Sequence, residues 1–256
     1  MRPILISALC LALSACGGVP PRGAAILPPA FGDADPHPWA GGAAPGDLPV
    51  HGTDASRFQG RVDWPAARAA GVSFAFLKAT EGGDRLDAAF ARNWAETRAA
   101  GIPRGAYHFI YFCRPAAEQA AWFIENVPVE PGALPPVLDA EWNPFSPTCT
   151  RRPPPEEVRA EMHAYLAAVA RHYGQTPIVY TTPDFYEAND LGQLGGVQFW
   201  LRSVANHPSA RYGRQPWAFW QYSGTGIVPG INGPADLNAF SGSLPEWRAW
   251  LARNAR

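Results

Sequence analysis

Short apolar runs alternate with amphipathic stretches through most of this chain, and this alternation constrains its fold more than any other feature. Short apolar runs between turn residues are typical of buried strands, and apolar residues that recur every third or fourth position are typical of helices. The strand pattern occurs eight times, at 50–54, 72–78, 105–112, 136–141, 178–181, 197–202, 217–222 and 235–238. Helical patterns cover 63–70, 88–100, 115–126, 156–173 and 244–253.

Strands that alternate with helices predict an α/β fold with a mainly parallel sheet. Eight such strands in one chain of this size predict a closed barrel of the TIM-like (β/α)8 type. Few helical residues separate the last strands, so we expect an irregular barrel with helix-poor late segments.

The first residues are predicted to form an export signal. Arg2 supplies a positive charge, and residues 4–13 form an apolar run too short to span a membrane. Residues 13–16 (LSAC) resemble the cleavage site of bacterial lipoproteins, in which Cys16 would become an acylated N-terminus. The alternative is an ordinary secretory leader cut after Ala15. Both predict export, and only the first predicts a membrane anchor. The anchored protein would face the cell wall, in the periplasm or at the outer membrane where two membranes are present.

Composition divides the rest of the chain. Residues 17–49 are rich in Gly, Pro and Ala without a periodic apolar pattern, so residues 16–49 are predicted to be a lipidated cysteine with a flexible tether. Residues 50–256 are long enough for one folded domain. The net charge of −1 argues against nucleic acid as a partner, and against holding an anionic polymer by bulk electrostatics.

Two cysteines remain beyond the leader and Cys16. Cys113 and Cys149 each follow a predicted strand in an exported, oxidising context, so they could form one disulfide. Two buried free thiols are the alternative. The spacing of Cys and His predicts no metal site, and we expect no cofactor.

Two carboxylates at the end of the fourth predicted strand are the strongest chemical signal. Asp139 and Glu141 are separated by Ala140, and because side chains alternate along a strand, both carboxylates project to the same face. Like charges held close push their pKa values apart, so one group stays protonated as a general acid. Cleavage of a glycosidic bond requires such a pair. The alternative is that these acids cap a following turn.

Further polar and aromatic side chains lie at or near the carboxyl ends of the predicted strands, where the chemistry of such barrels collects. They are Asp54, Glu81, Tyr107, Trp220, Gln221 and Asp236. Tyr107 and His108 point to opposite faces, so we expect Tyr107 to join the polar cluster, with a core aromatic as the alternative, and His108 to be structural.

Lys78 is the only lysine in a chain whose other cations are arginines. A compact ammonium on a flexible stem fits where a guanidinium fork does not. We therefore predict a partly buried ion pair of Lys78 with Glu81 or an aspartate at the site floor, with chance retention of one lysine as the alternative.

A series of motifs resembles the lysozymes of glycoside hydrolase family 25. The motifs occupy residues 51–60 (HGTDASRFQG), 76–82 (FLKATEG), 105–109 (GAYHF), 137–141 (VLDAE), 219–222 (FWQY) and 236–238 (DLN). The resemblance runs from about residue 50 to residue 240. Thr53 stands where an aliphatic residue is common in the family, and Ala55 and Ala140 stand where Val is frequent. None of these departures removes a reacting group.

The resemblance implies hydrolysis of the β-1,4 bond between N-acetylmuramic acid and N-acetylglucosamine in peptidoglycan, with retention of configuration, by a catalytic barrel at residues 50–256. Glu141 matches the general acid/base. Asp139 matches the second carboxylate, which would either orient the substrate's acetamido group or attack the sugar itself. Asp54 and Asp236 match acids expected to line the sugar site and hold Glu141 protonated, although each could instead bond its own loop.

The resemblance also suggests contacts with the sugar. We expect Tyr107, Gln221, Glu81 and Lys78 to belong to the substrate site. Trp220 and Trp142 are candidates for stacking on sugar rings, with core packing as the alternative, and stacking is favoured only at Trp220.

The expected partners are peptidoglycan strands and, through the lipid, a membrane, with the protein acting as a monomer. Two other functions remain open. They are a non-catalytic glycan-binding lipoprotein on the same barrel, and a hydrolase of another N-acetylated polymer such as chitin.

Overall fold

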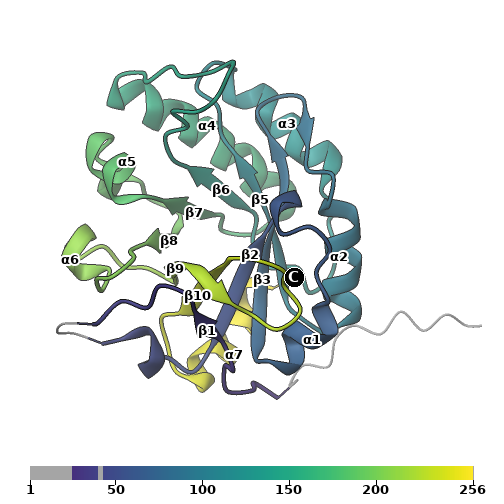
Figure 1. The fold of residues 1–256 in the computed structure, drawn as a ribbon. Helices are drawn as coiled ribbons and strands as arrows, with labels where there is room; N and C mark the ends of the chain where they lie inside the picture. Colours follow the sequence, from purple (N-terminus) through teal and green to yellow (C-terminus); the bar gives the residue numbers. More distant parts are fainter. Residues whose placement is uncertain (1–24, 40–42, 256) are drawn as a thin grey trace, which may run out of the picture.

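Eight strands close into a barrel in the computed structural model, which describes residues 25–39 and 43–255 (Figure 1). Around the barrel they follow the order β2 (His51–Ala55), β3 (Val72–Glu81), β5 (Arg104–Phe109), β6 (Val137–Ala140), β7 (Ile178–Thr181), β8 (Gln198–Arg202), β9 (Phe219–Ile227) and β10 (Ala235–Phe240). β10 pairs with β2 and closes the barrel. Two short strands lie at its edges: β1 (Gly32–Asp33) pairs with β9, and β4 (Arg85–Leu86) pairs with β3. The TIM-like barrel predicted from the sequence is confirmed.

The last strand departs from a regular (β/α)8 barrel in its direction. All pairings from β2 round to β9 are parallel, whereas β10 is antiparallel to both β9 and β2. The carboxyl ends of the parallel strands therefore meet the beginning of β10 at one edge of the barrel. Asp236, the second residue of β10, consequently faces Asp54 of β2 across the ladder.

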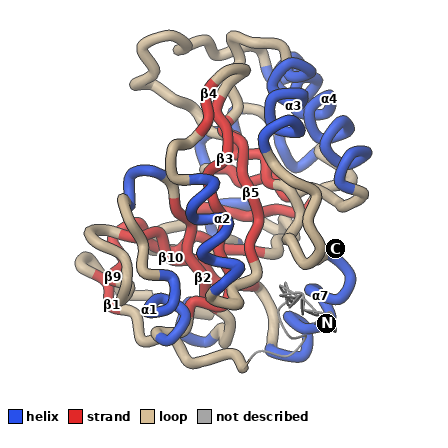
Figure 2. The backbone as a smooth tube through the Cα atoms, turned by 90° about the vertical axis from the view of Figure 1, so that its right-hand side faces the viewer, coloured by secondary structure: helices blue, strands red, loops and turns tan. Residues whose placement is uncertain are grey.

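The helices are unevenly distributed around the barrel. They are α1 (Trp64–Ala69), α2 (Phe90–Ala99), α3 (Ala116–Asn126), α4 (Pro155–Tyr173), α5 (Pro183–Ala188), α6 (Ser209–Tyr212) and α7 (Leu244–Asn254), with 3-10 turns at Pro45–Asp47, Arg57–Gln59 and Leu191–Gln193. Figure 2 shows the longer helices α2, α3 and α4 against one side of the barrel. Only short helices follow β7 and β8, and none lies between β9 and β10. The predicted helix-poor late region is thus confirmed.

Aromatic side chains fill the barrel below its carboxyl edge. Phe74 and Phe76 of β3 point into the barrel, and Trp200 of β8 stacks on Phe76 with ring centroids 4.6 Å apart. At the amino end, Trp247 of α7 packs against Phe74 with ring centroids 5.6 Å apart and so closes the barrel from below. The barrel is therefore a solid core, and a substrate site has room only at the carboxyl edge.

The flexible tether predicted for residues 16–49 is wrong for the part that the structure describes. β1 pairs with β9, the Ala30 amide donates to the Ala70 carbonyl at 2.8 Å, and Trp39 packs edge-on against Trp220 with ring centroids 5.2 Å apart. A two-residue strand among isolated apolar residues has no period, so the sequence pattern does not reveal it. The predicted leader and Cys16 lie outside the described residues. Within the described ranges, no helix is long and apolar enough to cross a membrane.

Candidate active site

A cavity of about 390 Å³ opens at the carboxyl edge of the barrel. Its lining consists of Asp54, Ala55, Ser56, Phe58, Gln59, Tyr107, Asp139, Glu141, Tyr180, Thr182, Trp200, Arg202, Gln221 and Asp236. The structure thus brings together four of the five carboxylates singled out in the sequence, all except Glu81, with Tyr107 and Gln221. A larger groove of about 760 Å³ lies beside α1 and α2, and it contains none of those residues.

Asp139 and Glu141 lie at the end of β6, where the alternation expected from the sequence holds. Ala140 between them is buried in the core outside the barrel, whereas both acids line the cavity. Burial, followed by the charge of Glu141, raises the pKa of Asp139 well above its ordinary value. Its Oδ1 has no hydrogen-bond partner within the described ranges. Burial also raises the pKa of Glu141 to about 7, against the lowering effect of Arg202.

Asp54 and Asp236 form a second acidic pair in the same cavity. Asp54 Oδ2 accepts hydrogen bonds from Gln221 Nε2 at 3.0 Å and from Asn238 Nδ2 at 2.7 Å. Burial nevertheless raises the pKa of Asp54 to about 6. Burial, followed by the charge of Asp54, raises the pKa of Asp236 to about 8. Two carboxyls this close retain one proton between them near neutral pH.

Tyr107 and His108 face opposite sides of β5. Tyr107 lines the cavity, where burial and the charges of Asp54, Asp139 and Asp236 raise the pKa of its hydroxyl well above the ordinary value, so it stays a donor. His108 is fully buried, with Nδ1 2.8 Å from Thr80 Oγ1 and Nε2 3.2 Å from Gln119 Oε1. Burial lowers the pKa of His108 to about 3, so the ring is neutral. The predicted structural histidine is confirmed.

Lys78 and Glu81 form the predicted ion pair, although neither side chain lines the cavity. Lys78 Nζ lies 2.6 Å from Glu81 Oε2 and 4.9 Å from the centroid of the Phe109 ring. The Tyr111 hydroxyl donates to Glu81 Oε1, and Arg85 lies 3.7 Å from the same oxygen. Burial opposes ionisation, but the Lys78 and Tyr111 hydrogen bonds outweigh it and lower the pKa of Glu81. The charge of Lys78 nevertheless reaches the cavity, since it lowers the pKa values of Asp139 and Glu141 against the effect of burial.

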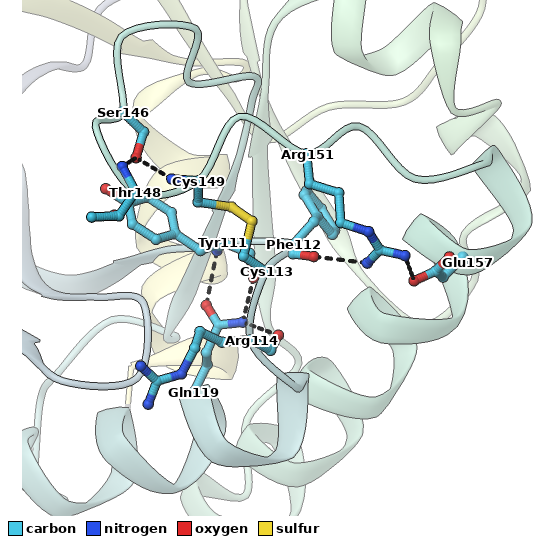
Figure 3. Close-up of a disulfide and its surroundings, with 10 residues drawn as sticks. All are labelled: Tyr111, Phe112, Cys113, Arg114, Gln119, Ser146, Thr148, Cys149, Arg151 and Glu157. Carbon is cyan, nitrogen blue, oxygen red and sulfur yellow. Dashed lines mark hydrogen bonds and ion pairs between the residues drawn. A yellow bond between two sulfur atoms is a disulfide. The ribbon is translucent and has the colours of Figure 1, made fainter.

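A disulfide joins Cys113 and Cys149, with their Cα atoms 5.8 Å apart (Figure 3). Cys149 lies in the loop that follows Glu141, and its amide donates to Ser146 Oγ at 3.0 Å. Arg151 Nη1 donates to the Phe112 carbonyl at 2.9 Å, which adds a second tie between the two loops. The disulfide that the sequence left open is therefore present, and it restrains the loop that leaves the cavity.

The sequence profile of the glycosyl hydrolases family 25 matches residues 53–231. The chain belongs to this family. The lysozyme of Streptomyces coelicolor has the same fold, with a TM-score of 0.72 and 32% identity over 79% of this chain and 96% of that one. A family 25 glycosyl hydrolase from Bacillus anthracis gives a TM-score of 0.71 and 32% identity, over 79% of this chain and 94% of that one.

Curated relatives have similar identity. Lysozyme M1 of Streptomyces globisporus is 35% identical over 216 residues, 80% of this chain and 72% of that protein. The uncharacterised protein YegX of Escherichia coli K12 is 36% identical over 218 residues, 81% of this chain and 75% of that protein.

The two tryptophans considered for stacking on sugar rings both lie outside the cavity lining of this family 25 chain. Trp220 is 0% exposed and donates Nε1 to the Ser203 carbonyl at 2.8 Å, so sugar stacking at Trp220 is wrong. Alternation along β9 turns Gln221 into the cavity and Trp220 outward, where Trp39 covers it. Trp142 is half-buried against Phe185, with ring centroids 4.5 Å apart, and it lies outside the cavity lining.

The sequence analysis missed three kinds of cavity residue. Arg202 ends β8 and Thr182 directly follows β7, so the strand-end rule would have found both. Tyr180 points inward from β7 and donates its hydroxyl to Gln221 Oε1 at 2.8 Å. Phe58 is 75% exposed at the rim, in a 3-10 turn that no strand pattern reveals. No group of three metal-ligating side chains is found in the described part of the chain.

Proposed function

We propose that this chain is a lysozyme, which hydrolyses the β-1,4 bond between N-acetylmuramic acid and N-acetylglucosamine in peptidoglycan. The observation that carries the proposal is the placement of Asp139 and Glu141 in one cavity of a family 25 barrel, both with raised pKa values. A carboxyl with a pKa of about 7 supplies a proton near neutral pH and is then left as a base. The lysozymes among its relatives support this substrate.

In this proposal Glu141 is the general acid and then the general base. The bond between the anomeric carbon and the bridging oxygen breaks, its electron pair passes to that oxygen, and the oxygen takes the proton of Glu141. The Glu141 carboxylate then removes a proton from the water that attacks the anomeric carbon. The proton count of the enzyme is thereby restored at the end of each cycle.

We assign to Asp139 the orientation of the acetamido group of the substrate. The acetamido oxygen attacks the anomeric carbon from the face opposite the leaving group, and water later displaces it, so two inversions give retention. An acetamido N–H that donates to Asp139 favours its ionised form, which leaves the proton of the pair on Glu141. Direct attack by Asp139 is the alternative. Peptidoglycan with deacetylated muramic acid separates the two, because only direct attack would still cleave it.

Asp54, Asp236 and Tyr107 complete the proposed site. In addition to burial, the charge of Asp54 raises the pKa values of Asp139 and Glu141. The charge of Asp236 raises the pKa of Tyr107, whose hydroxyl is a donor for a sugar oxygen or a carboxylate. Gln221 holds Asp54 in place, since it donates to Asp54 and accepts from Tyr180. The substrate would thus meet a polar wall above an aromatic floor.

We also propose that the protein is exported and acts at the cell wall as a monomer, held to a membrane by lipid on Cys16. The Cys113–Cys149 disulfide supports an oxidising compartment. Mass spectrometry of the mature N-terminus tests the anchor, because cleavage after Ala15 leaves Cys16 first in either case, and lipidated and unmodified Cys16 differ in mass. Since residues 25–39 pack on the barrel, the catalytic unit would include them as well as the predicted 50–256.

Digestion of purified peptidoglycan tests the proposed activity. The chain from residue 17 onward is compared with Glu141→Gln and with Glu187→Gln, a matched change on the exposed face of α5. Released ends are reduced with borohydride and read by mass spectrometry. We expect reduced muramic acid ends from the parent and from Glu187→Gln, but not from Glu141→Gln. Binding of glycan without new ends from a folded parent chain would instead identify a binding protein.

A further inference from the structure

Arg202 occupies a position in the cavity that the proposed chemistry does not use. It is the last residue of β8, and its Cα partner across the ladder is Gln221 of β9. Directly paired residues of neighbouring strands project to the same face. Gln221 points into the cavity, where it donates to Asp54, and Arg202 lines the same cavity with a side chain that remains exposed.

The guanidinium of Arg202 is the only cation among the cavity-lining residues, beside four carboxylates. Within the described residues, no ion pair or hydrogen bond engages this guanidinium, whereas Arg104, Arg114 and Arg151 all bind carboxylates. Its charge lowers the pKa values of Glu141 and Asp236 in the cavity and those of the Tyr180 and Tyr212 hydroxyls, so these groups lie near it. The five donors of the fork are therefore open to a ligand.

We propose that Arg202 binds a carboxylate of the glycan substrate and so makes the site selective for muramic acid polymers; this inference rests on the proposed lysozyme function. Each muramic acid carries a lactyl group, whose carboxyl is either free or joined to a stem peptide that has carboxylates of its own. Whichever of the four cavity acids are ionised repel any such group, Asp54 foremost, since burial raises its pKa only to about 6. A planar guanidinium fork binds a carboxylate with two parallel hydrogen bonds and offsets that repulsion at one place.

Arg202 has a competing role that involves no substrate carboxylate. Its charge lowers the pKa values of Glu141 and Asp236, so it could simply set the pH at which the acids work. That role acts equally on charged and neutral glycans, because it operates on the enzyme alone. Selectivity between substrates is therefore the readout that separates the two roles.

The test compares kcat/KM on glycan strands that differ only in carboxylates. One substrate is peptidoglycan stripped of its stem peptides, which has free lactyl carboxylates, and its neutral match is the same material converted to methylamides. Intact peptidoglycan with and without the same amidation forms the second pair, which reports the stem carboxylates. Each pair is measured for the parent chain, Arg202→Gln, Arg202→Lys and Arg211→Gln, the last being an exposed arginine of α6 outside the cavity.

We expect the parent chain to favour the charged strands by about tenfold or more, as a charge-assisted bond to a carboxylate would give. Arg202→Gln should bring the charged-to-neutral ratio close to one, Arg202→Lys should give an intermediate ratio, and Arg211→Gln should keep the parent ratio. Preference in the first pair identifies the lactyl carboxylate, and preference in the second identifies the stem.

Two results would overturn the inference while leaving the lysozyme intact. One is a parent chain that cleaves charged and neutral strands equally well. The other is an unchanged charged-to-neutral ratio in Arg202→Gln, and a displaced pH optimum in that variant would then assign Arg202 to the tuning of the acids. Failure of the parent chain to cleave any of the substrates would instead refute the proposed function itself.

Discussion

Glu81 and Glu141 lie at the same edge of one barrel, yet their carboxyls have opposite pKa shifts. Glu81 ends β3 and Glu141 directly follows β6, and burial opposes ionisation of both. Lys78 and Tyr111 hydrogen-bond to Glu81 and lower its pKa, whereas no ion pair joins Glu141 to a cation within the described residues and its pKa rises to about 7. The comparison teaches that direct partners, rather than burial or position, separate a structural carboxylate from one that can supply a proton.

The same contrast extends to the other acids of the cavity. Asp139 and Asp236 form no ion pair with a cation within the described residues, and the pKa values of both are raised by burial and then by an acidic neighbour. Asp54 has two amide donors, and burial still raises its pKa to about 6. The acids with raised pKa values therefore lie together inside the cavity. Glu81, whose carboxylate is paired with Lys78 and Tyr111, lies outside its lining.

The largest expected effect is on turnover in Glu141→Gln. Loss of a positioned general acid should lower kcat by about 10²–10⁴-fold, because the leaving oxygen then departs without a proton. The same substitution at Glu81 should lower kcat by less than about tenfold, since Glu81 lies outside the cavity lining. The release of reducing ends at saturating substrate measures both. Equal losses in the two variants would contradict the distinction drawn between these glutamates.

The second-largest effect is on the free energy of unfolding, and here the substitution of Glu81 should be more damaging than that of Glu141. Glu81→Gln leaves the Lys78 ammonium largely buried without its carboxylate, so the free energy of unfolding should fall by about 2–4 kcal/mol at pH 7. Glu141→Gln removes a carboxyl that burial disfavours when charged, so it should not destabilise the fold. Denaturant unfolding of both variants provides the measurement, and a Glu141→Gln protein less stable than Glu81→Gln would refute the contrast.

The pH dependence of the free energy of unfolding should reveal the cavity acids whose pKa values are raised. Asp236 has a pKa of about 8 when folded against an ordinary value of 3.8, so its contribution to stability is full below pH 4 and is lost as the pH rises towards 8. Asp236→Asn removes this penalty. The variant should be more stable than the parent by about 1–3 kcal/mol at pH 8 and should gain nothing at pH 4. Denaturation at both pH values checks this, and an equal change at the two pH values would contradict it.

The smallest expected effect concerns the shape of the cation at residue 78. Lys78 Nζ fits between Glu81 Oε2 at 2.6 Å and the Phe109 ring at 4.9 Å, and a planar guanidinium in this place would displace one of them. Lys78→Arg should lower the free energy of unfolding by about 1 kcal/mol and lower turnover slightly. Thermal unfolding and turnover of this variant provide the measurement. If both were unchanged, any cation at residue 78 would suffice for the ion pair with Glu81.

The sequence predicts the proposed catalytic acids of the cavity well and the residues around them less well. Alternation along one strand is enough to bring Asp139 and Glu141 together, because the side-chain period of a strand is fixed. The proximity of Asp236 to Asp54 depends on the reversed direction of β10, which no local pattern encodes. Arg202 ends a predicted strand, so the strand-end rule places its side chain at this edge, but a lone cation carries no signature of glycosidic chemistry.

The errors at Trp220 and in the predicted tether have one common cause. Trp39 belongs to the Gly- and Pro-rich segment that was expected to be flexible, and it covers the outer face of Trp220. Contacts between segments so far apart in sequence have no local signal, so the cover over Trp220 could not be predicted. Its outward direction was predictable, because Trp220 alternates with Gln221 along the strand. The ion pair of Lys78 with Glu81, by contrast, spans three residues and was predictable from composition and spacing.

The most direct test of the account is a carboxyl ¹³C NMR titration of the glutamates, with the signals assigned by their loss in Glu141→Gln and Glu81→Gln. The account predicts that Glu141 titrates with a midpoint of about pH 7 and that Glu81 titrates below 4.5. A Glu141 signal with a midpoint near 4.5, in a folded chain, would show that the cavity holds no proton near neutral pH and would contradict its assignment as the general acid.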